Sequence, residues 1–301
     1  MRVGVDLGGT KIEALAIAED GGELVRRRRP TPRDDYQATV AAVRDIVQAV
    51  VADAGGGPAT VGVAIPGAIS PASGLIKNAN STWLIGQPFD RDLAAAIGQP
   101  VRLANDANCF ALSEATDGAA AGADCVFGVI IGTGTGGGIV IGGRLHQGAN
   151  LIAGEWGHTP LPWPDDDERP GPPCYCGRRG CIETFLSGPG LAAAHQAATG
   201  EALNGEQIVR AAAAGEAGAE ASLARYEGRL ARALGAIISI LDPDVIVLGG
   251  GLSNIPRLYR NVPALWLAHA FSDDVRTRLL PARHGDSSGV RGAAWLWPAA
   301  D

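Results

Sequence analysis

The sequence lacks three features that would point to common classes of protein. It has no apolar run near the ~20 residues that a membrane-spanning helix needs. It has no excess of positive charge, since 25 Lys and Arg stand against 32 Asp and Glu, for a net charge of −7. Its first residues, MRVGVDLGG, are typical of a strand that enters a glycine turn and not of a signal peptide. We therefore expect a cytoplasmic globular protein that binds neither membranes nor nucleic acid.

One basic run stands out against this acidic background, from Arg26 to Arg29. It follows a predicted strand, and charged side chains on an edge strand discourage pairing with other sheets. We therefore interpret the run as a solvated sheet edge and not as a binding patch.

Cysteine is scarce and unevenly placed. The chain has five cysteines, and three of them fall within residues 174–181, in the segment CYCGRRGCIE. Thiols stay reduced in the cytoplasm, and a single residue between Cys174 and Cys176 is too little for an unstrained disulfide. The pattern favours a metal site, with free surface thiols or a redox pair as alternatives.

A zinc site of this kind needs a fourth ligand, because structural Zn²⁺ takes four nitrogen or sulfur ligands. His158 is the best candidate, sixteen residues upstream of Cys174 across the proline-rich loop 160–173. Cys109 and Cys125 compete with it, but both lie in apolar segments and are typical of small core residues.

An internal duplication organises the rest of the chain. Residues 3–17, VGVDLGGTKIEALAI, align without gaps with residues 127–141, FGVIIGTGTGGGIVI, as strand, glycine turn and strand. Short apolar runs bounded by glycine at 61–65 and 245–248 predict further strands buried on both faces, with helical stretches between them. The sequence therefore predicts two related α/β domains.

The glycine turns are candidates for phosphate binding. In DLGGTK, residues 6–11, exposed backbone N–H groups could hold phosphate oxygens, Thr10 adds a hydroxyl and Lys11 a cation. Asp6 could hold water around Mg²⁺. The spacing is not that of a Walker motif, and an ordinary hairpin turn is the alternative.

Two further glycine turns follow strands in the second half of the chain, and together the three suggest a nucleotide clamped between the domains. The residues assigned to it are Asp6, Gly8, Gly9, Thr10, Lys11, Gly132, Thr133, Gly134, Gly249, Gly250 and Gly251.

Asp106 follows the predicted strand 101–104 and directly precedes a predicted helix. A carboxylate there could accept a proton from a substrate hydroxyl. It could equally be the N-cap of the helix, which is a common role for aspartate. The spacing leaves both interpretations open.

Taken together, DLGGTK at 6–11, the run IGTGTGGGI with the later GEWGH at 154–158, and CYCGRRGCIE at 174–183 resemble motifs of the ROK family of bacterial sugar kinases. The resemblance implies an α/β fold of two RNase H-like, actin-like ATPase domains with ATP in the interdomain cleft. The implied domains are 1–119 with 286–301, and 120–285 with a zinc-binding loop. A homodimer is also expected.

The resemblance also implies roles for single residues. Asp106 resembles the catalytic base, and ATP, Mg²⁺ and Zn²⁺ are the implied cofactors. The implied sugar ligands are Asn80, Asn105, Asp106, Glu155, His158 and Glu183, and the implied zinc ligands are His158, Cys174, Cys176 and Cys181.

Three stretches, at 77–90, 103–109 and 284–297, resemble family fructokinases that also take mannose. We therefore predict transfer of the ATP γ-phosphoryl group to the 6-OH of D-fructose, to form fructose 6-phosphate. The alternatives are a glucokinase or an N-acetylglucosamine or N-acetylmannosamine kinase of the same family. A non-catalytic sugar sensor is disfavoured by an intact Asp106 and Lys11, and no helix-turn-helix precedes the strand that begins at residue 3.

Overall fold

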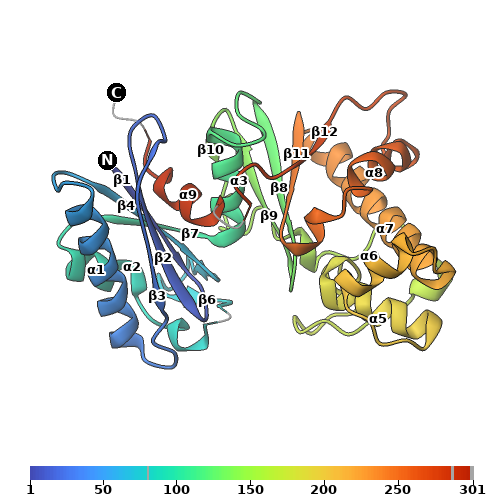
Figure 1. Ribbon diagram of the computed structural model, residues 1–301, viewed down its shortest axis with the longest axis horizontal. Coiled ribbons are helices and arrows are strands. Elements are labelled where there is room, and N and C mark those ends of the chain that lie inside the picture. The colour runs from blue at the N-terminus through green and yellow to red at the C-terminus, as the bar shows by residue number, and fades with distance from the viewer. Residues whose placement is uncertain (80, 286–287, 299–301) are drawn as a thin grey trace. The chain divides into compact units, whose positions relative to one another are not determined.

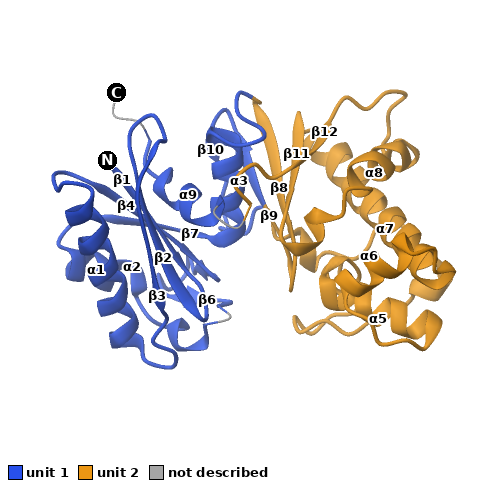
Figure 2. Ribbon diagram, in the orientation of Figure 1, with its two compact units in different colours: residues 1–122, 138–153, 286–301 blue, residues 123–137, 154–285 orange. Residues whose placement is uncertain are grey.

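The computed structural model describes residues 1–79, 81–285 and 288–298. The chain divides into two compact units (Figure 2), unit 1 with residues 1–122, 138–153 and 286–301 and unit 2 with residues 123–137 and 154–285. Within the described ranges, no helix combines the length and the apolar character needed to cross a membrane.

Unit 1 is built on a five-stranded sheet in the order β3-β2-β1-β4-β7. The first three strands are antiparallel, and β4 and β7 run parallel to β1. The inner strands are buried on both faces, which explains their continuous apolar sequences. The strands are β1 (Arg2–Leu7), β2 (Lys11–Ile17), β3 (Glu23–Pro30), β4 (Thr60–Ile65) and β7 (Val101–Asn105).

Helices cover this sheet on both faces (Figure 1). The apolar stripe of α1 (Tyr36–Asp53) packs with α2 (Phe89–Ile97) against one face. The other face carries α9 (Ser288–Ala294). A Cβ on Gly4 of β1 would lie 2.0 Å from the carbonyl oxygen of Val290, so α9 approaches the sheet more closely than any larger residue would allow. Beside α9 lies α3 (Asp106–Thr116).

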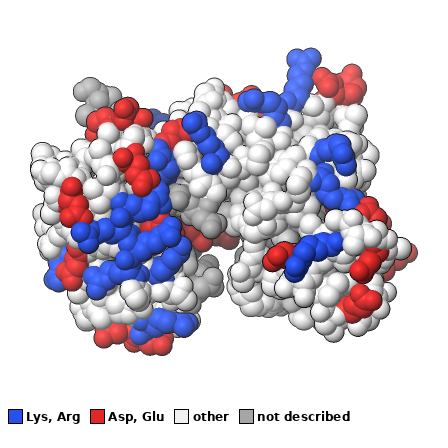
Figure 3. Space-filling model, viewed as in Figure 1, with Lys and Arg blue, Asp and Glu red and all other residues white. Residues whose placement is uncertain are grey.

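The basic run lies on β3, at the edge of the sheet. Lys and Arg side chains gather on the part of unit 1 that carries this strand (Figure 3). Carboxylates oppose them: Arg28 and Arg26 pair with Glu13 of β2, and Arg27 pairs with Asp53 of α1. The prediction of a charged sheet edge is confirmed.

Unit 2 contains β8 (Cys125–Ile131), β11 (Val245–Gly249) and β12 (Arg278–Pro281), with β11 parallel to both neighbours. The second sheet has the order β10-β9-β8-β11-β12, where β9 is Thr135–Ile141 and β10 is Arg144–Leu145. Strand by strand this order corresponds to that of the first sheet. The predicted α/β fold with two related halves is therefore confirmed.

The helices of unit 2 are grouped around α7 (Ala217–Leu241), whose buried stripe includes Leu223, Tyr226, Leu230 and Leu234. Two of the helices around it have clear boundary signals: α5 ends at Gly200, which is in the left-handed conformation, and the Asn204 capping box precedes α6. The helices around α7 are α4 (Glu183–Leu186), α5 (Gly188–Thr199), α6 (Gly205–Ala213) and α8 (Leu258–Trp266).

The remaining elements are short. Unit 1 has a two-stranded ribbon of β5 (Ala68–Ile69) and β6 (Ile76–Lys77), and the single turn η1 (Thr82–Leu84). Unit 2 has the turns η2 (Trp156–His158), η3 (Asp166–Glu168), η4 (Gly251–Asn254) and η5 (Leu267–His269).

A buried ion cluster holds the proline-rich loop 160–173 against α7. Glu168 of η3 is 4% exposed, and its Oε1 accepts from Nε of Arg229 at 2.7 Å. Its two carboxylate oxygens also accept from Nη2 of Arg232 at 2.8 Å. The arginines hold the pKa of Glu168 below its usual range although burial alone would raise it.

Candidate functional site

The first glycine turn joins β1 to β2 in unit 1. The N–H of Gly8 donates to the carbonyl of Lys11 at 3.0 Å, and the Thr31 hydroxyl donates to the carbonyl of Gly8 at 2.7 Å. Gly9, Thr10 and Lys11 are exposed at the tip. The turn is thus a hairpin turn whose tip faces solvent, with Lys11 as its cation.

Asp6 and Asp106 interact in unit 1, although they lie a hundred residues apart in the sequence. Burial raises the pKa of Asp6 to about 6, and the charges of Asp106 and Glu13 add to the rise while Lys11 opposes it. The structure therefore brings the predicted Mg²⁺ group and the predicted base within electrostatic reach of one another.

The N-cap of α3 is Asn105 and not Asp106. The Oδ1 of Asn105 accepts from the N–H of Ala107 at 2.9 Å, and its Nδ2 donates to the carbonyl of Gly67 at 3.4 Å. Asp106 is the first residue of the helix and is exposed, and its Oδ1 also accepts from the Ala107 N–H, at 2.8 Å. The interpretation of Asp106 as the N-cap is wrong, because the residue before it takes that position.

The other two glycine turns meet in unit 2. A Cβ on Gly132 would lie 3.8 Å from the backbone nitrogen of Gly251. Gly250 has φ +81°, and a Cβ there would lie 2.6 Å from the carbonyl oxygen of Ile131, so a larger residue would force the turn apart. The turns 132–134 and 249–251 therefore lie close together in unit 2. Thr133, Gly250 and Gly251 are exposed there, whereas the Gly132 N–H already donates to the carbonyl of Gly134 at 3.0 Å.

Glu183 reaches the same turns from the cysteine-bearing loop. Its Oε2 accepts from the N–H of Thr135 at 3.0 Å, and a Cβ on Gly134 would lie 2.8 Å from that oxygen. Glu183 thus lies against the backbone of the turn 132–134, two residues after Cys181.

The segment GEWGH forms η2 and packs on the start of β9. Nε1 of Trp156 donates to the carbonyl of Gly136 at 2.9 Å, and a Cβ on Gly157 would lie 2.0 Å from the carbonyl oxygen of Thr135. These contacts leave Glu155 exposed and turn His158 toward the cysteines.

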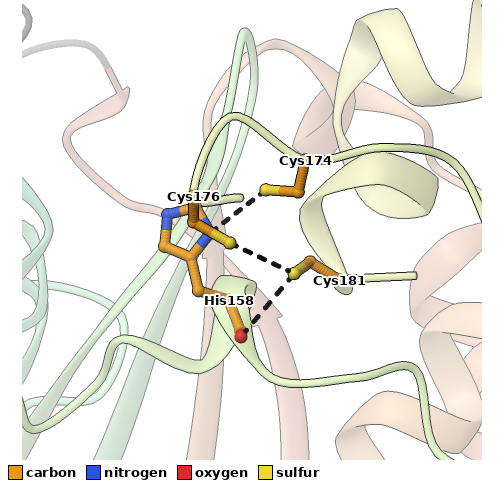
Figure 4. A group of neighbouring side chains, drawn as sticks. All are labelled: His158, Cys174, Cys176 and Cys181. Carbon is orange, nitrogen blue, oxygen red and sulfur yellow. Dashed lines mark hydrogen bonds between the residues drawn. The ribbon is translucent and has the colours of Figure 1, made fainter. Parts of the chain in front are cut away.

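Four predicted metal ligands come together in one cluster (Figure 4), with their ligand atoms all within 4.8 Å of one another. Nδ1 of His158 lies 3.5 Å from Sγ of Cys174, and the sulfurs of Cys176 and Cys181 lie 3.6 Å apart. A tetrahedral site with Zn–S bonds of about 2.3 Å has ligand atoms roughly 3.8 Å apart. The donor set and its spacing therefore fit zinc. Within the described ranges it is the one group of three or more His, Cys, Asp and Glu side chains close enough together to hold a metal ion.

The competing cysteines lie elsewhere. Cys109 is fully buried against Ala64, Ala104 and Ala293 in unit 1, and burial raises the pKa of its thiol. Cys125 begins β8. Neither belongs to the cluster.

Sequence reasoning missed Tyr175, whose hydroxyl lies 2.9 Å from Nε2 of His158. Its position inside the cysteine motif was visible, but no spacing rule assigns a role to the residue between two ligands. Asn80, a predicted sugar ligand, lies outside the described residues.

Comparisons with known proteins agree over nearly the whole chain. The sequence pattern that defines the ROK family matches residues 2–300. An N-acetyl-D-glucosamine kinase of Yersinia pseudotuberculosis is 40% identical over 300 residues, and one of Photobacterium profundum is 41% identical over the same length. These alignments cover 98% of this chain and 98% and 99% of the relatives.

Solved structures of ROK-family proteins are also similar to this chain over nearly its whole length. The ROK hexokinase of Thermus thermophilus is 31% identical with a TM-score of 0.87, covering 98% of this chain and 97% of that one. A ROK glucokinase of Streptomyces griseus in complex with glucose and AMPPNP is 30% identical with a TM-score of 0.77, covering 99% of both chains.

The predicted substrate fails this comparison. Fructokinase was inferred from three short stretches, whereas the relatives that match at about 40% identity along their whole length are N-acetyl-D-glucosamine kinases. The short stretches misled because sugars with similar hydroxyl patterns are bound by the same carboxylates and amides, so those residues do not separate one hexose from another. The prediction of fructose is wrong, while the family inferred from the motifs is confirmed: the chain belongs to the ROK family.

Proposed function

We propose that this protein is an ATP-dependent kinase that phosphorylates N-acetyl-D-glucosamine at its 6-hydroxyl. The observation that carries the proposal is the identity of about 40%, over 98% of the chain, to N-acetyl-D-glucosamine kinases. The nucleotide is supported by the related glucokinase, which was solved with AMPPNP, and by the glycine turns of both units. The alternatives of glucose and N-acetylmannosamine become outcomes of the test.

Unit 1 supplies the residues for phosphoryl transfer in this proposal. Asp106, exposed at the start of α3, accepts the proton of the attacking hydroxyl. Asp6, near the end of β1, would hold Mg²⁺ through water, and the metal bound with ATP would neutralise phosphate charge. Lys11 and the N–H groups of the turn tip favour the phosphate oxygens.

Unit 2 supplies the sugar-binding residues. Glu155 is exposed beside His158, and Glu183 is anchored by the Thr135 N–H. Carboxylates accept hydrogen bonds from sugar hydroxyls. Glu155 directly precedes η2, which packs on the start of β9, and Glu183 begins α4 directly after the cysteine loop. Asn105 has its side-chain amide engaged at both ends by backbone, so its role is to hold the start of α3, where Asp106 lies, as much as to bind sugar.

We further propose that the His158, Cys174, Cys176 and Cys181 cluster binds zinc with a structural role. Four nitrogen and sulfur donors form a closed set with no position left for a reacting group. The metal would hold the loop that ends at Cys181, and with it the adjacent Glu183. Zinc therefore supports the geometry of sugar binding and takes no part in phosphoryl transfer.

The substrate is tested with a coupled ADP-release assay across N-acetylglucosamine, N-acetylmannosamine, glucose, mannose and fructose. We expect kcat/KM to be highest for N-acetylglucosamine. A higher value for another sugar contradicts the proposed substrate but leaves a sugar kinase, whereas no ADP release with any hexose favours a sensor.

The proposed base is tested with Asp106→Asn, which is nearly isosteric but cannot accept the proton. We expect kcat to fall by about 10²–10⁴-fold, with sugar affinity measured by calorimetry little changed. Asp53→Asn, at an exposed surface ion pair in the same unit, is the matched control. Near wild-type turnover of Asp106→Asn would show that another group takes the proton.

The zinc proposal is tested by metal analysis of freshly purified, reduced protein. We expect about one zinc per chain, and a chelator should lower the melting temperature before it affects reactions with excess Mg²⁺-ATP. Protein that contains no zinc contradicts the proposal. The expected homodimer and cytoplasmic location stay predictions, which mass measurement in solution and fractionation would test.

A further inference from the structure

Tyr175 lies between two of the zinc-type ligands, Cys174 and Cys176, and contacts a third. Its hydroxyl is 2.9 Å from Nε2 of His158, and the two rings meet edge to face with centroids 5.0 Å apart and an interplanar angle of 90°. The side chain is 80% exposed. An exposed tyrosine that nevertheless directs both its ring and its hydroxyl at one imidazole is placed by that contact and not by burial.

The contact distinguishes the two nitrogens of His158. Nδ1 lies on the side of the thiols, 3.5 Å from Sγ of Cys174, while Nε2 faces Tyr175. If Nδ1 gives its lone pair to a metal, the ring proton must lie on Nε2, where it donates to the oxygen of the Tyr175 hydroxyl. Within the described ranges, Cys174 and Tyr175 are the hydrogen-bond partners of the ring nitrogens.

The backbone around His158 gives the ring little help of its own. His158 ends the single turn η2, and among the described residues the contact to its carbonyl is a long one, 3.7 Å from Sγ of Cys181. A partner for the outer nitrogen is therefore what selects the ring orientation in which Nδ1 points at the thiols. Such outer partners of metal-binding histidines fix both tautomer and orientation.

We propose that Tyr175 is a positioning residue, whose hydroxyl holds the His158 imidazole with Nδ1 toward the three thiols and so sets how firmly the cluster retains zinc. The inference rests on the zinc site proposed above. It assigns a role to a side chain that does not itself bind the metal. It also explains why an aromatic residue with a hydroxyl, and not any small residue, stands in the short link between two ligands.

The test compares zinc retention in Tyr175→Phe, which keeps the ring and loses the hydroxyl, with wild-type protein. Zinc loss to a chromogenic chelator is followed at increasing chelator concentration. We expect zinc affinity to fall about 10-fold, at the low end of the effect of such outer partners because the contact is exposed. Tyr175→Ala, which also removes the ring contact, should lose zinc at least as readily.

Tyr36→Phe is the matched control, because its hydroxyl donates to Asp92 in unit 1 at 2.6 Å, away from the cluster. It should retain zinc like wild-type protein. A direct readout is the Nε2–H proton of His158 in zinc-loaded, ¹⁵N-histidine-labelled protein, which should exchange with water faster in Tyr175→Phe. A merely structural effect of the substitution would not change that proton.

The outcomes separate the two proposals. If wild-type protein holds zinc and Tyr175→Phe holds it equally tightly, with the same Nε2–H exchange, the role of Tyr175 is refuted while the zinc site stands. If wild-type protein contains no zinc and takes up none, the zinc site fails and this inference fails with it. Weaker zinc retention with faster Nε2–H exchange supports both.

Discussion

Asp6 offers a sharp test of how the buried carboxylates of unit 1 are held. Its pKa is raised from the ordinary value of 3.8 to about 6, first by burial and then by the charges of Asp106 and Glu13. A carboxyl that binds its proton more tightly in the folded protein contributes stability that is complete below the unfolded pKa. That contribution is lost as the pH rises through the folded pKa.

The magnitude follows from this shift. Each pKa unit corresponds to about 1.36 kcal/mol, so ionised Asp6 costs the folded protein about 3 kcal/mol above the pKa of about 6. Asp6→Asn cannot ionise and avoids this cost. We therefore expect the free energy of unfolding of the variant, relative to that of wild-type protein, to rise by about 3 kcal/mol as the pH is raised from roughly 4 to 8.

The assay is urea unfolding in magnesium-free buffer, with hydrogen exchange of the β1 amides reporting on unit 1 so that unit 2 does not contribute. Asp53→Asn, at a surface ion pair, serves as the control, and its free energy of unfolding relative to wild type should show no such pH step, that is, no comparable change with pH. Asp106→Asn should shrink the step without abolishing it, because burial is the largest cause of the shift. An equal difference between wild type and Asp6→Asn at both ends of the pH range would refute the reasoning.

The same step links stability to function. A cation near Asp6 favours the ionised carboxylate and lowers its pKa. If Asp6 holds water around Mg²⁺ as proposed, the pH step should shrink when Mg²⁺-ATP is added.

Two further predictions concern the contacts that stabilise each unit. Glu168→Gln removes a carboxylate from two buried arginines and should cost about 3–5 kcal/mol in urea unfolding, whereas Glu206→Gln at an exposed pair should change little. In wild-type protein the stabilisation by Glu168 should be lost as the pH falls through its lowered pKa. A stability difference between wild type and Glu168→Gln that does not change at acid pH would contradict this. Gly292→Ala places a Cβ 1.7 Å from the carbonyl oxygen of Cys109 and should unfold α9 from unit 1 at lower temperature. Gly228→Ala in α7 meets nothing within 4 Å and should be neutral or stabilising by up to about 1 kcal/mol, so equal melting shifts would count against the packing argument.

The duplicated fold was predictable because its signals are local. Apolar runs of strand length end at glycine turns in both halves, and the two sheets follow the same strand order. The closeness of α9 to the first sheet was not predictable, because it depends on which faces of Gly4 and Gly62 meet a helix from the far end of the chain. No short-range pattern contains that pairing.

Some features of the candidate site were likewise predictable from local sequence signals, and others were not. The four residues of the metal cluster lie within residues 158–181, so their spacing was enough to group them. The capping of α3 by Asn105 was missed because two adjacent residues were both capable of it, and the side-chain direction decides between them. The substrate was mistaken because residues that bind hydroxyl groups are shared by kinases of different hexoses.

Glu183 shows what the structure adds to such local patterns. In the sequence it stands two positions after Cys181, and its role as a sugar ligand is implied only by the family resemblance. In the structure its Oε2 accepts from the N–H of Thr135, at the start of β9 and directly after the turn 132–134. The cysteine loop, a proposed sugar ligand and a proposed phosphate turn are therefore joined through one carboxylate. If the cluster binds zinc as proposed, loss of the metal should disturb the turn as well as sugar binding, because zinc would hold the loop that carries Glu183.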